Sequence, residues 1–209
     1  MRPFVIGICG GSGSGKTTLL KKLSNFYGQE EVSILTMDNY YFPIEEQQKD
    51  ENGIVNFDLP TALNEKKLSE DLQELVNGNT IEVKEYFFNS PPDKNVLLSV
   101  ISKEIIIVEG LFIFHYPKVR ALIDFSVFVE VDASVQLDRR IYRDQDSRGY
   151  SQQEIIYQWN EHVTPCYNNY ILPYKPKADI LYRNDFNSEE DFLSLTNKLL
   201  QNRKIINEG

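Results

Sequence analysis

The chain has 209 residues, 41% of them hydrophobic and 25% charged, a composition typical of a globular protein with a sizeable core. Its formal net charge of −9 argues against broad binding to nucleic acid or to an acidic membrane surface. The two cysteines, Cys9 and Cys166, suggest neither a disulfide framework nor a metal site. We see no signal peptide and no apolar run of membrane-spanning length, so we expect a cytoplasmic protein.

The first apolar run, Phe4–Cys9, leads into a glycine-rich loop and then into a helical pattern that begins at Lys16. The loop fits the phosphate-binding pattern Gly-x-x-x-x-Gly-Lys-Thr in its proper strand–loop–helix setting. Glycines let successive backbone N–H groups converge on phosphate oxygens, and the helix N-terminus adds its positive dipole end. The predicted nucleotide-binding residues of the loop are Gly10, Gly11, Ser12, Gly13, Ser14, Gly15, Lys16, Thr17 and Thr18. The alternative is a glycine-rich turn that binds no ligand.

Apolar runs and helical patterns then alternate along the chain, which predicts a parallel sheet covered by helices on both faces. The other predicted strands are Val32–Met37, Ile105–Val108, Phe125–Val131 and Ala178–Tyr182. The predicted helices are Lys16–Phe26, Leu63–Val76, Ala133–Asp144, Ser151–Leu172 with an interruption or kink at Pro165, and a last helix from Ser188. Short strands at Thr80–Phe88 and Asn95–Ile101 predict a β-hairpin inserted over about residues 79–102. We therefore expect one α/β domain over residues 1–209, a three-layer P-loop NTPase-type fold with a mostly parallel five-stranded sheet.

Acidic residues follow two of the predicted strands, at the sheet edge where α/β proteins bind ligands. Asp38 follows the second strand and is placed to accept a proton from an attacking hydroxyl, although it could instead cap a turn. Glu109 ends the third strand and is placed to organise Mg²⁺, together with the Thr17 hydroxyl. Lys16 would reach the terminal phosphates of the nucleotide.

The loop from Val55 to Ala62 contains an aromatic residue, Phe57, an acid, Asp58, and a proline. Such a loop could bind a ring and its hydroxyl groups, or it could cap the helix that follows. The residues alone do not decide between these readings.

Positive charge gathers over about residues 138–150, where Arg140 and Arg143 share a helix face and Arg148 precedes a glycine. Arginine suits phosphate because its planar fork donates two parallel hydrogen bonds. This segment is predicted to be a lid that closes over a nucleotide. The alternative is a solvated helix face, paired with neighbouring aspartates. His115 and His162 lack partners at metal-ligand spacing, and Trp159 lies on an apolar stripe, so we expect structural roles for all three.

Taken together, these motifs resemble the uridine kinase (uridine–cytidine kinase) family over nearly the whole chain and in the same order. The carrying segments are the P-loop, Asp38–Tyr41, Asn56–Pro60, Val108–Gly110, Arg139–Gly149, and Val163–Pro165 with Pro173–Ile180. The resemblance implies transfer of a phosphoryl group from ATP, with GTP as the alternative donor, to the 5′-hydroxyl of uridine or cytidine, in pyrimidine salvage and with Mg²⁺. It also implies a homo-oligomer, commonly a tetramer, that binds a small nucleoside as its substrate.

The resemblance assigns roles to individual residues. It makes Asp38 the catalytic base, assisted by Lys16 and Arg143. The nucleoside contacts that it implies, with Asn89 added as a substitute donor and acceptor, are Asp38, Tyr41, Phe57, Asp58, Tyr86, Asn89, Arg140 and Gln158. Arg140, Arg143 and Arg148 become phosphate and lid residues.

This chain departs from the family pattern in the inserted hairpin. The family's Tyr-Asp-Phe segment reads Tyr86-Phe87-Phe88 here, and Pro91 stands where a pyrimidine-reading histidine is expected. Tyr150 also replaces a second arginine that usually follows the lid glycine. These changes bear on the choice of acceptor and leave phosphoryl transfer intact. Two alternatives stay open: another small-molecule kinase, phosphoribulokinase-like or pantothenate-kinase-like, and a nucleotide-dependent switch or binding protein.

Overall fold

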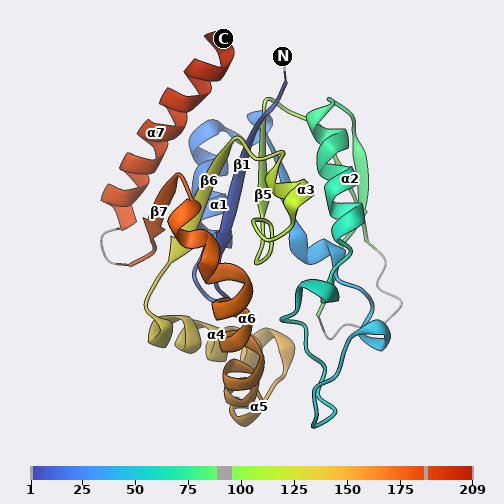
Figure 1. Cartoon of the computed structure of the whole chain (residues 1–209). Coiled ribbons are helices and arrows are strands. Elements are labelled where there is room, and N and C mark those ends of the chain that lie inside the picture. Colours follow the sequence, from blue (N-terminus) through green and yellow to red (C-terminus); the bar gives the residue numbers. More distant parts are fainter. Residues whose placement is uncertain (1, 89–95, 186–187, 209) are drawn as a thin grey trace.

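A computed structural model of the chain describes residues 2–88, 96–185 and 188–208, with the side chains of 204–208 excepted. At its centre is a parallel five-stranded sheet with the strand order β2-β5-β1-β6-β7 (Figure 1). The strands are β1 (Phe4–Gly10), β2 (Val32–Thr36), β5 (Ile105–Glu109), β6 (Phe125–Glu130) and β7 (Ile180–Arg183). All residues of β1 and β5 are buried, as expected for apolar strands with both faces covered.

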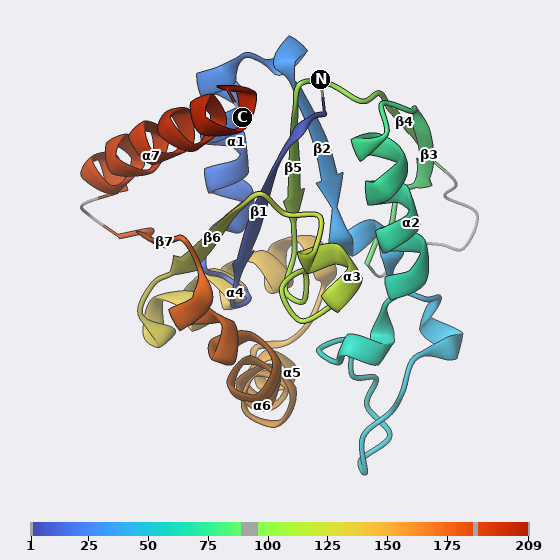
Figure 2. The ribbon, with the colours of Figure 1, turned by 45° about the horizontal axis from the view of Figure 1, so that its top comes forward.

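Helices cover the two faces of the sheet and form two separate cores (Figure 2). One core joins the sheet to α2 (Glu65–Val76) through Leu68, Leu72 and Leu75. The other joins it to α1 (Lys16–Tyr27) and α7 (Ser188–Glu208), where Leu23 and Leu199 are buried. A short helix, α3 (Pro117–Arg120), was not predicted, because four residues carry too little periodicity.

The predicted hairpin is present, as an antiparallel pair separate from the main sheet. It consists of β3 (Ile81–Lys84) and β4 (Leu97–Val100), which are shorter than the predicted strands. Over the described ranges, none of the helices combines the length and the apolarity that a membrane-crossing segment needs.

Two helix boundaries differ from the prediction for local reasons. Helix α2 begins two residues after Leu63, because the Asn64 side chain caps it by accepting a hydrogen bond from the Lys67 amide (3.0 Å), while Leu63 pairs with Tyr41 in a β-bridge. Helix α4 (Ala133–Arg148) runs four residues beyond the predicted end, up to Gly149 in the left-handed conformation.

The long helical segment after α4 stays helical through Pro165, but its hydrogen-bond pattern changes on both sides of the proline. A Ser151–Glu154 capping box begins α5 (Gln152–Gln158). A π-helical turn (Trp159–Val163), α6 (Thr164–Cys166), a second π-helical turn (Tyr167–Ile171) and a 3₁₀ turn (Leu172–Lys177) follow. The predicted interruption is therefore present as widened turns around the proline, which lacks an amide donor.

Candidate active site

The glycine-rich loop connects β1 to α1 and packs against helix α4. Gly13 (φ 76°) and Gly15 (φ 98°) adopt backbone conformations that side chains rarely adopt. A Cβ atom on Gly13 would lie 2.5 Å from the backbone oxygen of Gln136 in α4. Both the conformation and the close approach of α4 therefore require glycine at position 13.

Lys16 and Ser14 hold polar groups toward the inside of this loop. The Lys16 ammonium donates hydrogen bonds to the carbonyl oxygens of Gly10 and Gly11, both at 3.1 Å. The Ser14 hydroxyl is buried and has no hydrogen-bond partner among the described residues. A buried hydroxyl without a partner carries a desolvation cost, so the glycine loop holds one unsatisfied polar group directly behind its phosphate-binding face.

Two carboxylates approach the loop from the neighbouring strands. Glu109 ends β5, paired in register with Thr36 of β2, and Asp38 follows β2 in a 3₁₀ turn (Met37–Tyr40). Burial and the nearby charge of Asp38 raise the pKa of Glu109 to about 7, against the opposing effects of Lys16 and a hydrogen bond from Thr36. Two acids and a lysine thus share one corner of the site, in which Glu109 is buried.

The residues in this corner fit a hard divalent cation. The Thr17 hydroxyl and the Glu109 carboxylate, which line one cavity with Asp38, are oxygen ligands of the kind that Mg²⁺ prefers. No cluster of three or more histidine, cysteine or acidic side chains suited to a metal occurs in the described ranges. One hydroxyl and one carboxylate suit an ion that also takes ligands from phosphate oxygens and water, as Mg²⁺ does in nucleotide sites.

The arginines of α4 surround a single buried acid. Asp144 is fully buried, and the guanidinium Nε atoms of Arg143, Arg140 and Arg148 lie 2.7, 3.3 and 3.5 Å from its carboxylate oxygens. Burial and the neighbouring arginine charges lower the pKa of Arg148. The solvated-face alternative does not apply to Arg140, which is buried as well.

Arg140 connects the nucleotide loop to the opposite wall of the site. Its Nη1 donates to the Ser12 hydroxyl and its Nη2 to the Gln158 side-chain oxygen, both at 3.1 Å. The Asp58 carboxylate lies 3.8 Å from Nη2. Arg139, which was not among the predicted site residues, donates weakly to the Gly13 carbonyl oxygen at 3.4 Å.

An aromatic wall stands beside Asp38. Tyr41 lies within 5.2–5.8 Å, centroid to centroid, of Phe57, Tyr86 and Phe88. Burial and the charges of Asp38 and Asp58 raise the pKa of Tyr41 well above its ordinary value, so its hydroxyl stays protonated. The Arg148 guanidinium lies 4.0 Å from the centroid of the Phe88 ring. Tyr40, by contrast, turns away and donates to Asp71 of α2.

These groups line a common cavity of about 250 Å³. The predicted site residues that line it are Ser12, Gly13, Gly15, Lys16, Thr17, Asp38, Tyr41, Phe57, Asp58, Glu109, Arg140, Arg143, Arg148 and Gln158. Sequence reasoning missed five further lining residues, Val55, Phe88, Leu111, Arg139 and Tyr150, and gave His162 a structural role. Asn89 and Pro91 lie outside the described residues.

The other predicted site residues lie around this cavity rather than along it. Gly10, Gly11 and Ser14 complete the glycine loop behind it, Tyr86 packs on Tyr41, and Thr18 is exposed on the first turn of α1. His115 contacts Tyr170 and Tyr174. Trp159 is half-buried and lines a second cavity of about 320 Å³ with Cys166 and Tyr167, so it is less enclosed than a core position.

The family match and the individual relatives of this chain point to the same family. Residues 5–185 match the family described as "Phosphoribulokinase / Uridine kinase family". A uridine kinase of Clostridium perfringens (strain SM101 / Type A) is 36% identical over 180 residues, 86% of each chain. The uridine-cytidine kinase B of Dictyostelium discoideum is 31% identical, over 86% of this chain and 74% of that protein.

Solved structures show the same fold at lower identity. The phosphoribulokinase from Rhodobacter spheroides superposes with a TM-score of 0.64 at 16% identity, covering 87% of this chain and 70% of that one. The glycine loop, the two acids at the strand ends and the arginine helix thus stand in a recognised scaffold. The chain belongs to the phosphoribulokinase/uridine kinase family.

Proposed function

We propose that this chain is a nucleoside kinase, which transfers the γ-phosphoryl group of ATP to the 5′-hydroxyl of uridine or cytidine. The observation that carries the proposal is the shared cavity, which Asp38 and Lys16 line together with Asp58 and the contacting rings of Tyr41 and Phe57. Relatives more than 30% identical that carry the names uridine kinase and uridine-cytidine kinase support the choice of acceptor.

The charged residues at the nucleotide end of the cavity then have chemical tasks. Asp38 orients the acceptor hydroxyl and accepts its proton, while Lys16 and the loop amides stabilise charge on the transferred phosphoryl group. Thr17 and Glu109 would hold Mg²⁺, which supplies charge neutralisation when bound. Arg140 and Arg143 position the phosphates.

The acceptor lies against the aromatic wall in this proposal. Tyr41, Phe57 and Phe88 enclose the base, with Tyr86 behind them, and Asp58 and Gln158 bind polar groups of the nucleoside. Asn89 stays a predicted base contact. ATP is the proposed donor, with GTP as the alternative. The homo-oligomer stays a prediction from the resemblance, and the cytoplasmic location stays a prediction from the sequence.

The test is ADP release with Mg·ATP and a panel of acceptors. Release stimulated by uridine or cytidine would support the proposal. Stimulation only by ribulose 5-phosphate or pantothenate would favour a related small-molecule kinase, an alternative suggested by Phe87 and Pro91 in the hairpin. ATP binding without any acceptor-stimulated release would favour a switch or binding protein.

A further inference from the structure

A projecting loop beside the cavity folds back on itself as a small hairpin. Lys49 and Val55 form an antiparallel bridge, and the amide of Asn56 donates to the carbonyl oxygen of Gln48 at 2.8 Å. Gly53, at φ 77°, lies at its tip. Residues 48–56, here named the acceptor hairpin, lead directly into Phe57 and Asp58 of the cavity wall.

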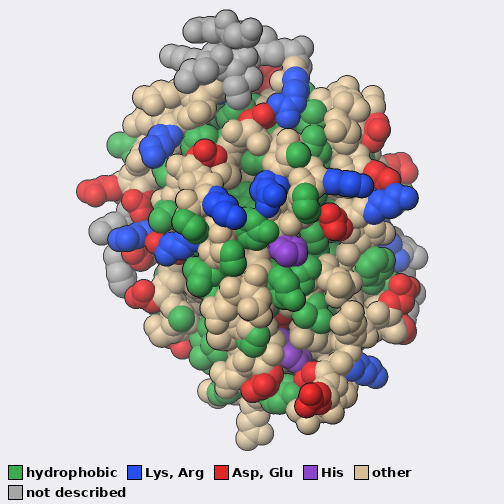
Figure 3. Space-filling view, viewed as in Figure 1, with side chains coloured by type: hydrophobic (Ala, Val, Ile, Leu, Met, Phe, Trp, Pro, Cys, Tyr) green, Lys and Arg blue, Asp and Glu red, His purple; other side chains and the backbone are tan. Residues whose placement is uncertain are grey.

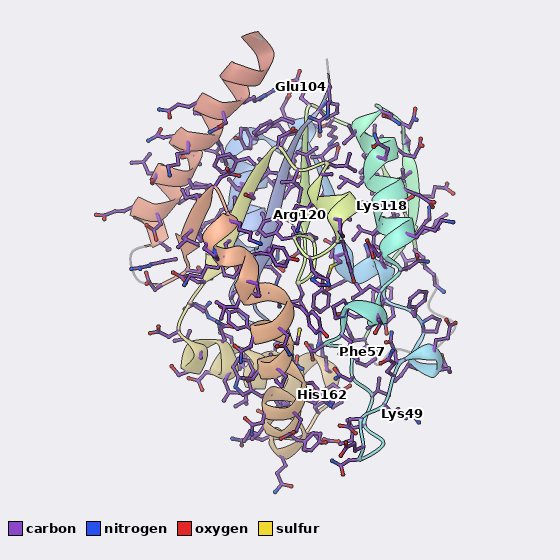
Figure 4. All side chains as sticks on the ribbon, in the orientation of Figure 1. Lys49, Phe57, Glu104, Lys118, Arg120 and His162 are labelled. Carbon is purple, nitrogen blue, oxygen red and sulfur yellow. The ribbon has the colours of Figure 1, made fainter. Side chains whose placement is uncertain are left out.

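Side-chain hydrogen bonds attach the acceptor hairpin to α5 and to the π-helical turn that follows it. The Tyr157 hydroxyl donates to Asp50 Oδ2 at 2.8 Å, and His162 Nε2 lies 2.8 Å from the same oxygen. The Asn52 side-chain amide donates to the Tyr157 hydroxyl at 2.7 Å. Figure 4 shows His162 on the helical segment and Lys49 on the neighbouring loop, at the same end of the molecule.

The other oxygen of Asp50 organises the hairpin itself. Asp50 Oδ1 accepts from the backbone amides of Asn52 and Ile54, both at 2.9 Å. Burial acts to raise the pKa of Asp50, but the hydrogen bonds from Tyr157, Ile54, His162 and Asn52 outweigh it and lower the pKa to about 2. One carboxylate therefore shapes the turn and attaches it to the helix.

Both sides of this contact carry residues of the cavity. Tyr157 precedes Gln158, whose side chain accepts from Arg140, and His162 lines the cavity while only 3% exposed. On the hairpin side, Val55 lines the same cavity. The contact thus fixes the distance between two walls that come from distant parts of the chain.

We propose that Asp50, Tyr157 and His162 form a polar clamp that positions the acceptor wall, making His162 a positioning residue for the acceptor rather than a core residue. The proposal rests on the assigned acceptor site. The clamp touches neither the glycine loop nor Lys16 in the hydrogen bonds described above. Its loss should therefore displace Phe57 and Asp58 directly, and reach the glycine loop only through Gln158 and Arg140.

The first test compares the KM for uridine with the KM for ATP in Asp50→Ala and His162→Phe. We expect the KM for uridine to rise about tenfold, because small displacements of positioning groups are costly, with the KM for ATP changed less than about twofold. The matched controls are Glu51→Ala and Asn160→Ala, both exposed neighbours, which should leave both constants unchanged. Equal changes in both constants, or none, would overturn the proposal.

A milder variant guards against misfolding, and a double variant tests the coupling. Tyr157→Phe removes only one hydroxyl and should raise the KM for uridine by a smaller factor. The variant that combines Asp50→Ala with His162→Phe should change KM by less than the product of the two single factors, because both remove one contact. Multiplicative effects would contradict a shared clamp.

Hydrogen exchange separates this proposal from the proposed function, because it needs no substrate. The amides of Asn52 and Ile54 should exchange at least about tenfold faster in Asp50→Ala and in His162→Phe than in the unmodified protein. Unchanged exchange in His162→Phe would overturn the clamp. If the unmodified protein shows no uridine-stimulated turnover, the proposed function fails, and faster exchange still supports the clamp.

Discussion

Asp38, Glu109 and Lys16 are neighbouring charged groups, and the charges of Asp38 and Lys16 both influence the pKa of Glu109. Glu109 is 5% exposed, and its pKa responds both to burial and to the charge of Asp38. Lys16 opposes both effects, so removing either Asp38 or Lys16 should change the pKa of Glu109. The separate roles of Asp38 and Glu109 can be tested by substituting one residue at a time.

Asp38→Asn should nearly abolish turnover while leaving ATP affinity largely intact. The amide keeps the size of the side chain but cannot accept the proton, so we expect kcat to fall by about 10²–10⁴-fold. Steady-state kinetics gives kcat, and nucleotide titration under the same conditions gives the affinity. Loss of ATP binding in this variant would instead place Asp38 in the metal site.

Stability without Mg²⁺ should depend on pH through Glu109. Its pKa is raised from 4.5 to about 7 in the folded chain, so its stabilising contribution is complete below pH 4.5 and is lost as the pH rises through about 7. The shift corresponds to a change on the order of 3 kcal/mol in the free energy of unfolding. Urea unfolding between pH 4.5 and 8 should show this slope, and Glu109→Gln should flatten it. Parallel profiles for the two proteins would contradict the assignment.

At the scale of elements, the glycine loop and helix α4 work as one unit. The backbone of α4 approaches Gly13 closely, and Arg139 and Arg140 donate to the carbonyl oxygen of Gly13 and the hydroxyl of Ser12. The loop therefore has little room to change shape without moving the arginines that surround Asp144.

Gly13→Ala should lower nucleotide affinity, by about tenfold or more, because the new Cβ would push the loop away from Gln136. Gly78→Ala is the matched control. Gly78 also has a positive φ (88°), but a Cβ there meets nothing within 4 Å. It should cost about 1–2 kcal/mol of stability without any change in affinity. Isothermal titration with Mg·ATP separates the two, and equal affinities in both variants would contradict the close contact with α4.

The elements that could be predicted are those specified by local pattern. The apolar run of β1 and the glycine spacing place the phosphate loop, and the run before Glu109 places the acid at a strand end. The helical segment from α5 to α6 was less predictable, because Pro165 signals an interruption without indicating that π-helical turns flank it.

Contacts between distant segments were beyond the sequence. Asp50 and His162 are 112 positions apart, and nothing in either segment signals that they meet. The same holds for Arg148 and Phe88, which come together only because α4 and the inserted hairpin face one cavity. The role of a residue was predictable where a single sequence motif determines it. It was not predictable where the role depends on contact between two segments that are distant in the sequence.

At the scale of the molecule, an acidic chain concentrates positive charge where a nucleotide would bind. The formal net charge is −9, yet four arginines of α4 line the cavity. On the face drawn in Figure 3, Lys and Arg side chains are interspersed with other residues rather than joined in one continuous patch. The local field at the cavity, not the net charge, is thus the feature that favours phosphate.

Both cysteines report on the opening of one of the two cores. Cys9 and Cys166 lie in the same buried core, and burial raises the pKa of both thiols, that of Cys9 to about 12. The native protein at pH 8 should react with a thiol reagent at least about 100-fold more slowly than the unfolded chain. Rapid reaction of either thiol in the native protein would show that this core opens locally.

The most direct test of the central claim is to identify the product. The protein is incubated with Mg·ATP labelled in its γ-phosphoryl group and with uridine, and the products are separated and analysed by mass spectrometry and phosphorus NMR. The account predicts ADP and labelled uridine 5′-monophosphate, formed by the unmodified protein and not by Asp38→Asn. Label that appears only in inorganic phosphate, or that stays in ATP with every nucleoside tried, would contradict it.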